Sequence, residues 1–172
     1  MKNEIKFMVA DITTMEVDAI VNAANKTLLG GSGVDGAIHF AAGPELLEEC
    51  KKLGGCETGA AKITKGYRLP AKYVIHTVGP IYTGNSRNAA ELYSCYRSSL
   101  DLAAEHDLHS IAFPAISTGV YGYPKADAAM IAVKAVVNWL DEHKDYGMQV
   151  NMVCYSNADY KVYEQVVKGK GQ

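Results

Sequence analysis

The strongest constraint on the fold is the alternation of short apolar runs with longer amphipathic stretches. The apolar runs end in polar residues and have the length of buried strands. They occupy residues 5–12, 17–24, 60–67, 72–79, 110–118 and 148–156, and helical patterns occupy residues 34–42, 44–53, 87–105, 125–143 and 158–169. This alternation favours an α/β fold, with a largely parallel sheet sandwiched by helices and ligands at the carboxyl ends of the strands. The short RLPA segment predicts that 60–67 and 72–79 form a strand pair.

Three of the predicted helices carry apolar residues at helical spacing. We expect the helix over 87–105 to cover the sheet with Leu92, Tyr96, Ser99, Leu100 and Ala103. The helix over 125–143 is expected to bury Met130, Val133, Val137 and Leu140, and the last helix pairs Val162 with Val166 and Tyr163 with Val167. A chain of 172 residues is long enough for one core. We therefore expect a single domain over residues 1–172, with a frayed tail over 168–172.

Composition and charge exclude several classes of protein. The chain has 48% hydrophobic and 21% charged residues and a net charge of -2, which is typical of a globular domain and not of a basic nucleic-acid binder. It has no signal-peptide pattern and no run near the roughly 18 apolar residues that span a bilayer, so we expect a cytoplasmic protein. Cys50, Cys56, Cys95 and Cys154 form no CxxC pair and are expected to be buried, reduced thiols.

Two glycine-containing loops follow predicted strands and precede predicted helices: LLGGSGVDG at 28–36 and ISTGVYGYP at 116–124. Backbone amides in such loops, together with the positive end of a helix dipole, can bind phosphate. Glycine also serves strand-to-helix turns for purely conformational reasons, so this alternative stays open for each loop. Neither loop has the register of GxGxxG or the Gly-Lys-Ser/Thr ending of a P-loop, which disfavours hydride transfer and kinase chemistry.

Four polar side chains lie beside these loops or at strand ends. Asp35 falls near the start of a helix, where it either complements the helix dipole or acts on a ligand. Bound phosphates raise the pKa of such a carboxylate and helix amides lower it, so the sequence leaves its basicity open. Asn22 and Asn25 end the preceding strand and can form a turn or orient a sugar hydroxyl. Asp11 can cap a turn or accept a hydrogen bond from the amino group of a base.

The histidines and serines give little support to metal or hydrolytic triad chemistry. His39 is spaced to face the acid one turn earlier, but a partly buried helix histidine is the simpler interpretation. His76 lies in an apolar strand and is expected to be a hydrogen-bonded core residue. His106 and His109 have no acidic or cysteine cluster nearby, so no metal site is predicted. Ser117 lacks both a Gly-x-Ser-x-Gly elbow and a base partner, which disfavours serine hydrolysis.

Four long segments occur in order and without large gaps between roughly residues 5 and 165: ADITTMEVDAIVNAAN, LLGGSGVDGAIHFAAGPELLEEC, TGAAKITKGYRLPAKYVIHTVGP and IAFPAISTGVYGYP. In these segments the chain resembles the macrodomain family, and within it the MacroD-type ADP-ribose hydrolases. The resemblance implies a three-layer α/β/α fold around a mixed six-stranded sheet, with ADP-ribose in a cleft on its crest. It implies neither a cofactor nor a metal.

The resemblance also assigns roles to individual residues. Asp11, with Ile12, matches the acid that holds the adenine amino group, and Tyr155 takes the place of the aromatic that stacks on the base. Asn25 matches the distal-ribose asparagine and Asp35 the aspartate of the catalytic loop. The other implied ligand contacts are Asn22, Ala23, the first phosphate loop with Ser32, Gly33 and Val34, and the second with Ser117, Thr118, Gly119, Val120 and Tyr121, of which Tyr121 is placed near the distal ribose.

The chain departs from the family pattern at four positions. Ala10 replaces a frequent glycine, and Ser156 replaces an acid that often follows the stacking aromatic. Ser32 brings a side chain to where the diphosphate is expected to pass, and Phe40 replaces a frequent basic residue. None of these changes removes the two implied catalytic residues, so they bear on affinity and substrate preference rather than on reaction class.

Together these residues predict a hydrolase in which Asn25 holds the distal ribose and Asp35 positions a water. One well-placed carboxylate suits a substrate whose leaving group is stable as an anion, either ADP-ribose esterified to an acidic protein side chain or O-acetyl-ADP-ribose. The predicted partners are ADP-ribose and its derivatives and mono-ADP-ribosylated proteins, with no membrane partner. Two alternatives stay open: a module that binds ADP-ribose without cleaving it, and a binder of nucleic acid or poly(ADP-ribose), which the acidic balance disfavours.

Overall fold

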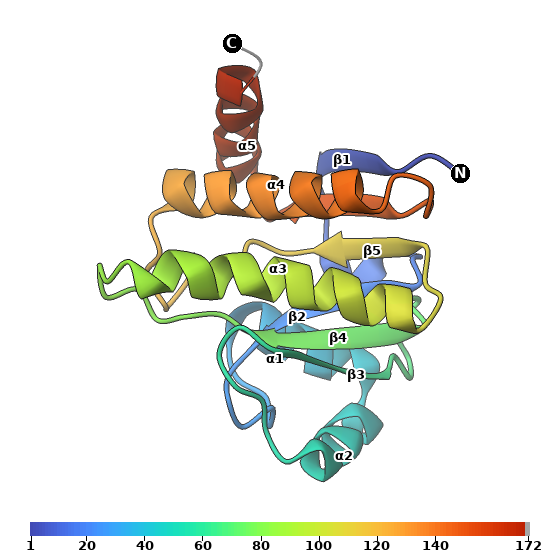
Figure 1. The fold of residues 1–172 in the computed structure, drawn as a ribbon. Coiled ribbons are helices and arrows are strands. Elements are labelled where there is room, and N and C mark those ends of the chain that lie inside the picture. The colour runs from blue at the N-terminus through green and yellow to red at the C-terminus, as the bar shows by residue number, and fades with distance from the viewer. Residues whose placement is uncertain (171–172) are drawn as a thin grey trace.

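The computed structural model describes residues 1–170 as a six-stranded sheet with helices on both faces (Figure 1). The strands are β1 (Glu4–Val9), β2 (Ala19–Ala24), β3 (Ala61–Lys65), β4 (Tyr73–Val78), β5 (Ser110–Phe113) and β6 (Gln149–Cys154). The helices are α1 (Gly33–Ala42), α2 (Pro44–Leu53), α3 (Arg87–Glu105), α4 (Lys125–Glu142) and α5 (Asn157–Lys170), and a short 3-10 helix, η1 (Ile12–Thr14), follows β1. The predicted alternation of strands and helices is confirmed.

The sheet has the strand order β1-β6-β5-β2-β4-β3. Among the described strands, β3 at one edge is antiparallel to its neighbour β4, and the other pairings are parallel. The connection between β3 and β4 is too short for a crossover, so these strands run in opposite directions, whereas parallel neighbours need longer connections. This confirms the predicted strand pair and the mixed six-stranded sheet.

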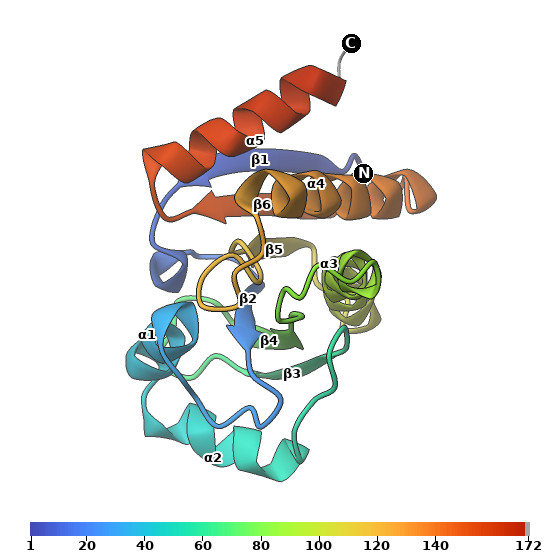
Figure 2. The same cartoon turned by 90° about the vertical axis from the view of Figure 1, so that its left-hand side faces the viewer.

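The helices form two outer layers, with α1 and α2 on one face of the sheet and α3 and α4 on the other (Figure 2). Helix α5 packs beside β1 and α4 at the edge (Figure 2). The α3 stripe is buried as predicted: Leu92, Tyr96, Ser99, Leu100 and Ala103 are each at most 1% exposed. Within residues 1–170, no helix has the length and apolar character needed to cross a membrane.

The predicted buried face of α4 is wrong in part. Met130 is 55% exposed, while Val133 is buried as expected and Val137 and Leu140 are half-buried. The helix instead centres its buried face on Ala128, Ala132 and Trp139, and Met130 is about 200° around the axis from both alanines. Small residues on this face allow α4 to lie close to α3, and Trp139 Nε1 donates to Asp101 Oδ1 across that contact at 2.8 Å.

Two predicted strands and the predicted tail also differ from the structure. The run over 110–118 leaves the sheet after Phe113, because Pro114 has no N–H to donate to a neighbouring strand. The run over 5–12 ends at Val9, since Asp11 caps η1 instead. Residues 168–170 of the expected frayed tail belong to α5, and residues 171–172 lie outside the described part of the chain. On α5, Tyr163 is buried but its expected partner Val167 is 42% exposed.

Candidate functional site

The predicted site residues gather at the carboxyl ends of the parallel strands, which we call the carboxyl edge. Asp11 follows β1, Tyr155 follows β6, Ser117 lies in the loop after β5, and Asn25 follows β2. The chain leaves β2 for α1 on one face and leaves the adjacent β5 for α4 on the other (Figure 2). Diverging connections from neighbouring strands mark the place where open α/β sheets bind ligands.

Asp35 is the buried carboxylate of the carboxyl edge. It is the third residue of α1 and is 5% exposed. Its Oδ1 accepts a hydrogen bond from Asn22 Nδ2 at 2.9 Å, and His39 Nε2 lies 3.5 Å from the same oxygen. A Cβ on Gly31 would lie 3.0 Å from Asp35 Oδ2 and 3.5 Å from Asn25 Nδ2. One carboxylate oxygen is therefore held from inside the protein, and the other lies beside the turn that carries Asn25.

The surroundings of Asp35 act on its pKa in opposing directions. Burial raises the pKa because it disfavours the charged form, while the hydrogen bond from Asn22 and the nearby His39 ring lower it. Burial is the largest effect, so the pKa of Asp35 lies above the ordinary value of a carboxyl group. A raised pKa makes this carboxylate a better proton acceptor near neutral pH. Asp35 also lies in the first turn of α1, as the helix-dipole alternative requires, but that alternative alone does not account for its burial.

Asn25 builds the turn that follows β2. Its Nδ2 donates to Gly30 O at 3.0 Å, and its Oδ1 accepts from Thr27 Oγ1 at 2.7 Å and from Leu28 N at 3.2 Å. Leu28 has a φ of 61° and a buried side chain. The turn is therefore stabilised by the hydrogen bonds of the Asn25 amide and by burial of Leu28. The turn-forming role considered for Asn25 is confirmed, and the contact with a sugar stays a prediction.

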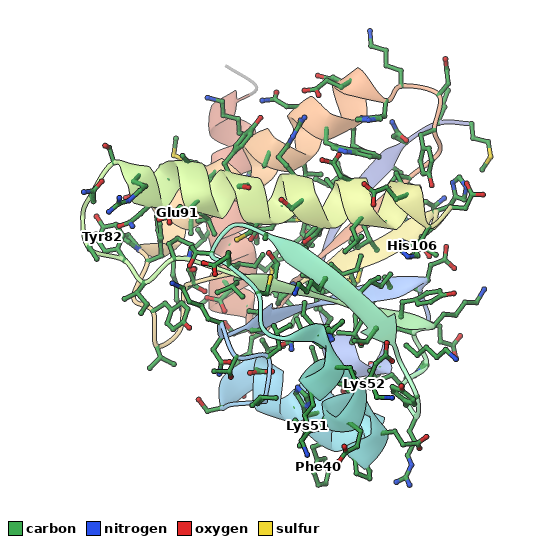
Figure 3. The ribbon with its side chains drawn as sticks, turned by 60° about the horizontal axis from the view of Figure 1, so that its bottom comes forward. Phe40, Lys51, Lys52, Tyr82, Glu91 and His106 are labelled. Carbon is green, nitrogen blue, oxygen red and sulfur yellow. The ribbon has the colours of Figure 1, made fainter. Side chains whose placement is uncertain are left out.

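The first glycine loop ends at the N-terminus of α1. Ser32 precedes the helix with an exposed side chain that makes no capping hydrogen bond. The first N–H groups of a helix have no acceptor within it, so those of Gly33 and Val34 are free to bind an anion at the positive end of the helix dipole. Phe40, another departure from the family pattern, is 91% exposed and points away from the body of the protein (Figure 3). It lies about 140° around α1 from Asp35.

The second loop is fixed by the segment that follows β4. Ser117 has a φ of 67° and is buried, and its Oγ donates to Pro80 O at 2.8 Å. A Cβ on Gly79 would overlap Ser117 Oγ, so only glycine permits this approach. Tyr82 N donates to Tyr121 O at 2.8 Å. The Ser117 hydroxyl is therefore already hydrogen-bonded within the protein. The backbone amides of the predicted phosphate loop are the groups that could contact a ligand. No local pattern in the sequence indicates this contact between two loops.

The predicted adenine end is more exposed. Asp11 Oδ1 accepts from Thr13 N at 3.0 Å and from Thr13 Oγ1 at 2.7 Å, so the turn-capping role considered for Asp11 is confirmed. Tyr155 is 94% exposed, and Ile12 is buried beneath the edge. Ser156 Oγ accepts from Asp159 N at 3.2 Å in the first turn of α5. This serine therefore caps a helix at the position where the family often has an acid.

The remaining histidines and the cysteines agree with their predicted structural roles. His76 is fully buried and contacts Asn22 Nδ2 and Thr64 Oγ1, as expected for a hydrogen-bonded core residue. His106 and His109 ring nitrogens lie 3.0 Å and 3.2 Å from backbone carbonyl oxygens. All four cysteines are free and buried. Over residues 1–170, no group of three His, Cys, Asp or Glu side chains is arranged to hold a metal ion.

A concavity of about 410 Å³ lies at the opposite, amino ends of the strands. It is lined by Glu16, Val17, Asp18, Pro70, Lys72 and Ser110. The Asp18 carboxylate there is already bonded to His109 N at 2.8 Å and lies 3.7 Å from Lys72 Nζ. The carboxylate in this hollow is therefore engaged by the protein itself.

Comparison with known proteins gives a consistent result. The family model described as Macro domain matches residues 21–132. The Macro domain-containing protein CT2219 of Chlorobaculum tepidum is 59% identical over 159 residues, which cover 92% of each chain. ADP-ribose glycohydrolase MACROD1 of Bos taurus is 56% identical over 96% of this chain, which spans about half (51%) of that relative. The Trypanosoma brucei macrodomain in complex with ADP-ribose superposes with a TM-score of 0.91 at 47% identity, over 95% of this chain and 69% of that one.

Proposed function

Because this chain belongs to the macrodomain family, we propose that it binds ADP-ribose at the carboxyl edge and hydrolyses mono-ADP-ribose esters of acidic protein side chains. A relative at 56% identity is named an ADP-ribose glycohydrolase, and a solved neighbour holds ADP-ribose. The observation that carries the proposal is the state of Asp35: buried, with a raised pKa, one oxygen held by Asn22 and the other beside Asn25. The cytoplasmic location stays a prediction.

In the proposed complex, the two amide-lined loops hold the diphosphate and the distal ribose lies beside Asn25. Asp35 Oδ2 accepts a proton from a water, whose oxygen attacks the anomeric carbon as the bond to the ester oxygen breaks. The departing group is a carboxylate with an ordinary pKa of about 4, so it leaves as an anion without a general acid. The proton on Asp35 then returns to solvent. This step needs a carboxylate, a water and the acidity of the leaving group, and no cofactor.

O-acetyl-ADP-ribose is a second proposed substrate for the same site. Asp35 takes a proton from the water as its oxygen adds to the acetyl carbon, and gives that proton to the ribose oxygen as the acyl bond breaks, so that acetate and ADP-ribose are formed. Both substrates combine a diphosphate, a distal ribose and a carboxylate leaving group or product. A single arrangement of loops and carboxylate therefore serves both.

One observation favours a reader that binds ADP-ribose without cleaving it. Both polar ends of the Asn25 amide are already bonded within its own turn, so a ribose must share or displace these bonds. Incubation with a protein that carries ADP-ribose on glutamate separates the two functions. A hydrolase releases the label, whereas a reader leaves it attached.

The test of the hydrolase is the substitution Asp35→Ala. Removal of a positioned acid-base group lowers turnover by about 100-fold or more, while ADP-ribose still binds through the loops. Asp127→Ala is a matched control, because Asp127 also lies in the first turn of a helix but is exposed. Release of labelled ADP-ribose from modified glutamate measures turnover, and calorimetry measures binding. Equal turnover of Asp35→Ala and the wild-type protein would refute the catalytic role.

A further inference from the structure

A buried chain of hydrogen bonds runs from Asp35 into the core. Asn22 Nδ2 lies 2.9 Å from Asp35 Oδ1 and 3.1 Å from His76 Nδ1. His76 Nε2 lies 2.9 Å from Thr64 Oγ1, which lies 3.1 Å from Lys65 O. Asn22 and His76 are 0% exposed, and Thr64 is 2% exposed. The chain crosses three neighbouring strands, β2, β4 and β3, and ends on the carboxylate proposed to act on water.

One arrangement of protons satisfies the whole chain. Burial lowers the pKa of His76 to about 3, so its ring is neutral and has one donor and one acceptor nitrogen. An amide nitrogen only donates, so His76 Nδ1 is the acceptor for Asn22. His76 Nε2 then carries the proton and donates to Thr64 Oγ1, whose hydroxyl donates to the carbonyl oxygen of Lys65. Both hydrogens of the Asn22 amide are used, one on His76 and one on Asp35.

The opposite end of the Asn22 amide has no partner. Asn22 Oδ1 is buried and accepts no hydrogen bond within the described residues. The oxygen therefore does not help to select the orientation of the amide. That orientation depends only on the two acceptors of Nδ2, which are Asp35 Oδ1 and His76 Nδ1. A half-turn of the amide would place Oδ1 against the carboxylate and repel its charged form.

We propose that His76 is a positioning residue for the hydrolysis: its Nδ1 fixes the Asn22 amide so that an N–H always faces Asp35 Oδ1, which leaves Oδ2 for the water. This inference rests on the proposed function for its consequence in catalysis, and on the hydrogen-bond geometry for its effect on Asp35. Without the Nδ1 acceptor only Asp35 orients the amide, so the N–H is held less firmly against Oδ1 and the proton stays on the carboxyl group to a higher pH.

Three titratable groups face Asp35 from the surrounding elements: His39 from α1, His76 through Asn22 from β4, and Cys50 from α2. Cys50 stays a neutral thiol because burial, helped by nearby acids, raises its pKa to about 11. Its Sγ lies 3.8 Å from His76 Nε2, farther than the Thr64 hydroxyl. His39 is the same in all the variants below, so its charge does not distinguish them.

The test compares His76→Leu with His76→Asn. Leucine and asparagine have the same shape, but only asparagine supplies an acceptor oxygen near the position of Nδ1, and both lose the donor to Thr64. We expect the pKa of Asp35, followed by the ¹³C resonance of its carboxyl carbon, to rise by about one pH unit in His76→Leu, as for loss of a hydrogen bond to a charged group. It should return most of the way to the wild-type value in His76→Asn.

Turnover is expected to follow the same order. For release of ADP-ribose from modified glutamate at a pH below the pKa of Asp35, His76→Leu should lower kcat by about tenfold, corresponding to about one pH unit, with the affinity for ADP-ribose unchanged. The acid limb of the pH profile should move upward with the pKa of Asp35, and His76→Asn should recover most of kcat. An equal pKa of Asp35 in the leucine and asparagine variants overturns the inference.

A second pair of variants, at Thr64, tests the same inference if His76→Leu does not fold. Thr64→Val removes the acceptor that holds the proton on His76 Nε2, and Thr64→Ser keeps it. We expect a higher pKa of Asp35 in Thr64→Val than in Thr64→Ser, and equal values overturn the inference. A wild-type protein without hydrolytic activity would contradict the proposed function, while the carboxyl titrations would still decide the role of His76.

Discussion

The two ends of the proposed binding site are built differently. At the adenine end, Tyr155 is 94% exposed, and Asp11 bonds to a residue two positions away. At the ribose end, Asp35 is buried and its partner Asn22 lies 13 positions earlier. Asn22 in turn contacts His76, which is 54 positions farther along the chain and in the neighbouring strand. One end is local and open, and the other is assembled from distant parts of the chain.

This difference bears on which end of the site determines the affinity for ADP-ribose and which end determines turnover. An exposed aromatic ring adapts to a base and contributes contact energy, but it needs no fixed position before the ligand arrives. A group that acts on a reacting bond must be held in advance, because a displacement of about 1 Å can cost about 100-fold in rate. We therefore expect changes at the adenine end to alter affinity and changes at the ribose end to alter turnover.

Among changes that leave Asp35 itself in place, the largest effect is expected for Asn22→Leu. Leucine has the shape of asparagine but leaves Asp35 Oδ1 buried without a donor, so turnover should fall by about 100-fold with little change in ADP-ribose affinity. Asn138→Leu is a control for the same chemical change, because it removes a hydrogen bond to Tyr93 between α4 and α3. Parallel kinetics and calorimetry check the result. A loss of affinity at constant kcat would instead make Asn22 a ligand contact and break the comparison.

The buried end should also make stability depend on pH. The pKa of His76 is about 3 in the folded protein and about 6.5 when unfolded, so the unfolded chain binds more protons between these values. The stabilising contribution is present above pH 6.5 and is lost as the pH falls toward 3, by about 3 kcal/mol at pH 4.5. Asp35, with a raised pKa, acts in the opposite direction and gains a proton more readily in the folded state.

Urea unfolding at several pH values isolates the contribution of His76. The stability of the wild-type protein should fall with acidity relative to that of His76→Asn, since asparagine does not titrate. The exposed His106, changed to asparagine, is the control. Parallel curves for all three proteins would contradict the assigned environment of His76.

A smaller effect is expected for Tyr155→Ala at the adenine end. Stacking of a base on an aromatic ring contributes about 1–3 kcal/mol, so the affinity for ADP-ribose should fall by about tenfold at unchanged kcat. Tyr155→Phe keeps the ring and should bind like the wild-type protein. Phe40→Ala removes another exposed ring, which lies at the surface of α1 (Figure 3), about 140° around the helix from Asp35. If Tyr155→Ala lowered kcat and left the affinity intact, the division between the two ends would be wrong.

Local features were predictable from the sequence because they depend on spacing along the chain. The alternation of strands and helices, the buried stripe of α3, the turn at Asn25 and the cap at Asp11 all belong to this class. The face of α4 was harder to predict, because alanines score weakly in a hydrophobic pattern although they allow close helix packing. Met130 was expected to be buried because its side chain is large and apolar, but it lies at the surface.

Contacts between distant segments were not predictable by spacing. His76 was expected to be a satisfied core residue, but its partner depends on the pairing of β2 with β4, in which Asn22 lies opposite His76. The contact of Ser117 with Pro80 likewise depends on the order of strands in the sheet. The resemblance to macrodomains supplied the expected roles of Asp35 and Asn25, which spacing alone left open between structure and chemistry.

The most direct test is a crystal structure of the wild-type protein with ADP-ribose. We predict the diphosphate against the backbone amides of the two glycine loops, the distal ribose beside Asn25, and a water within about 3 Å of Asp35 Oδ2 that faces the anomeric carbon. A ligand bound at the amino ends of the strands would contradict this account. So would a distal ribose turned away from Asp35, with no water between the carboxylate and the sugar.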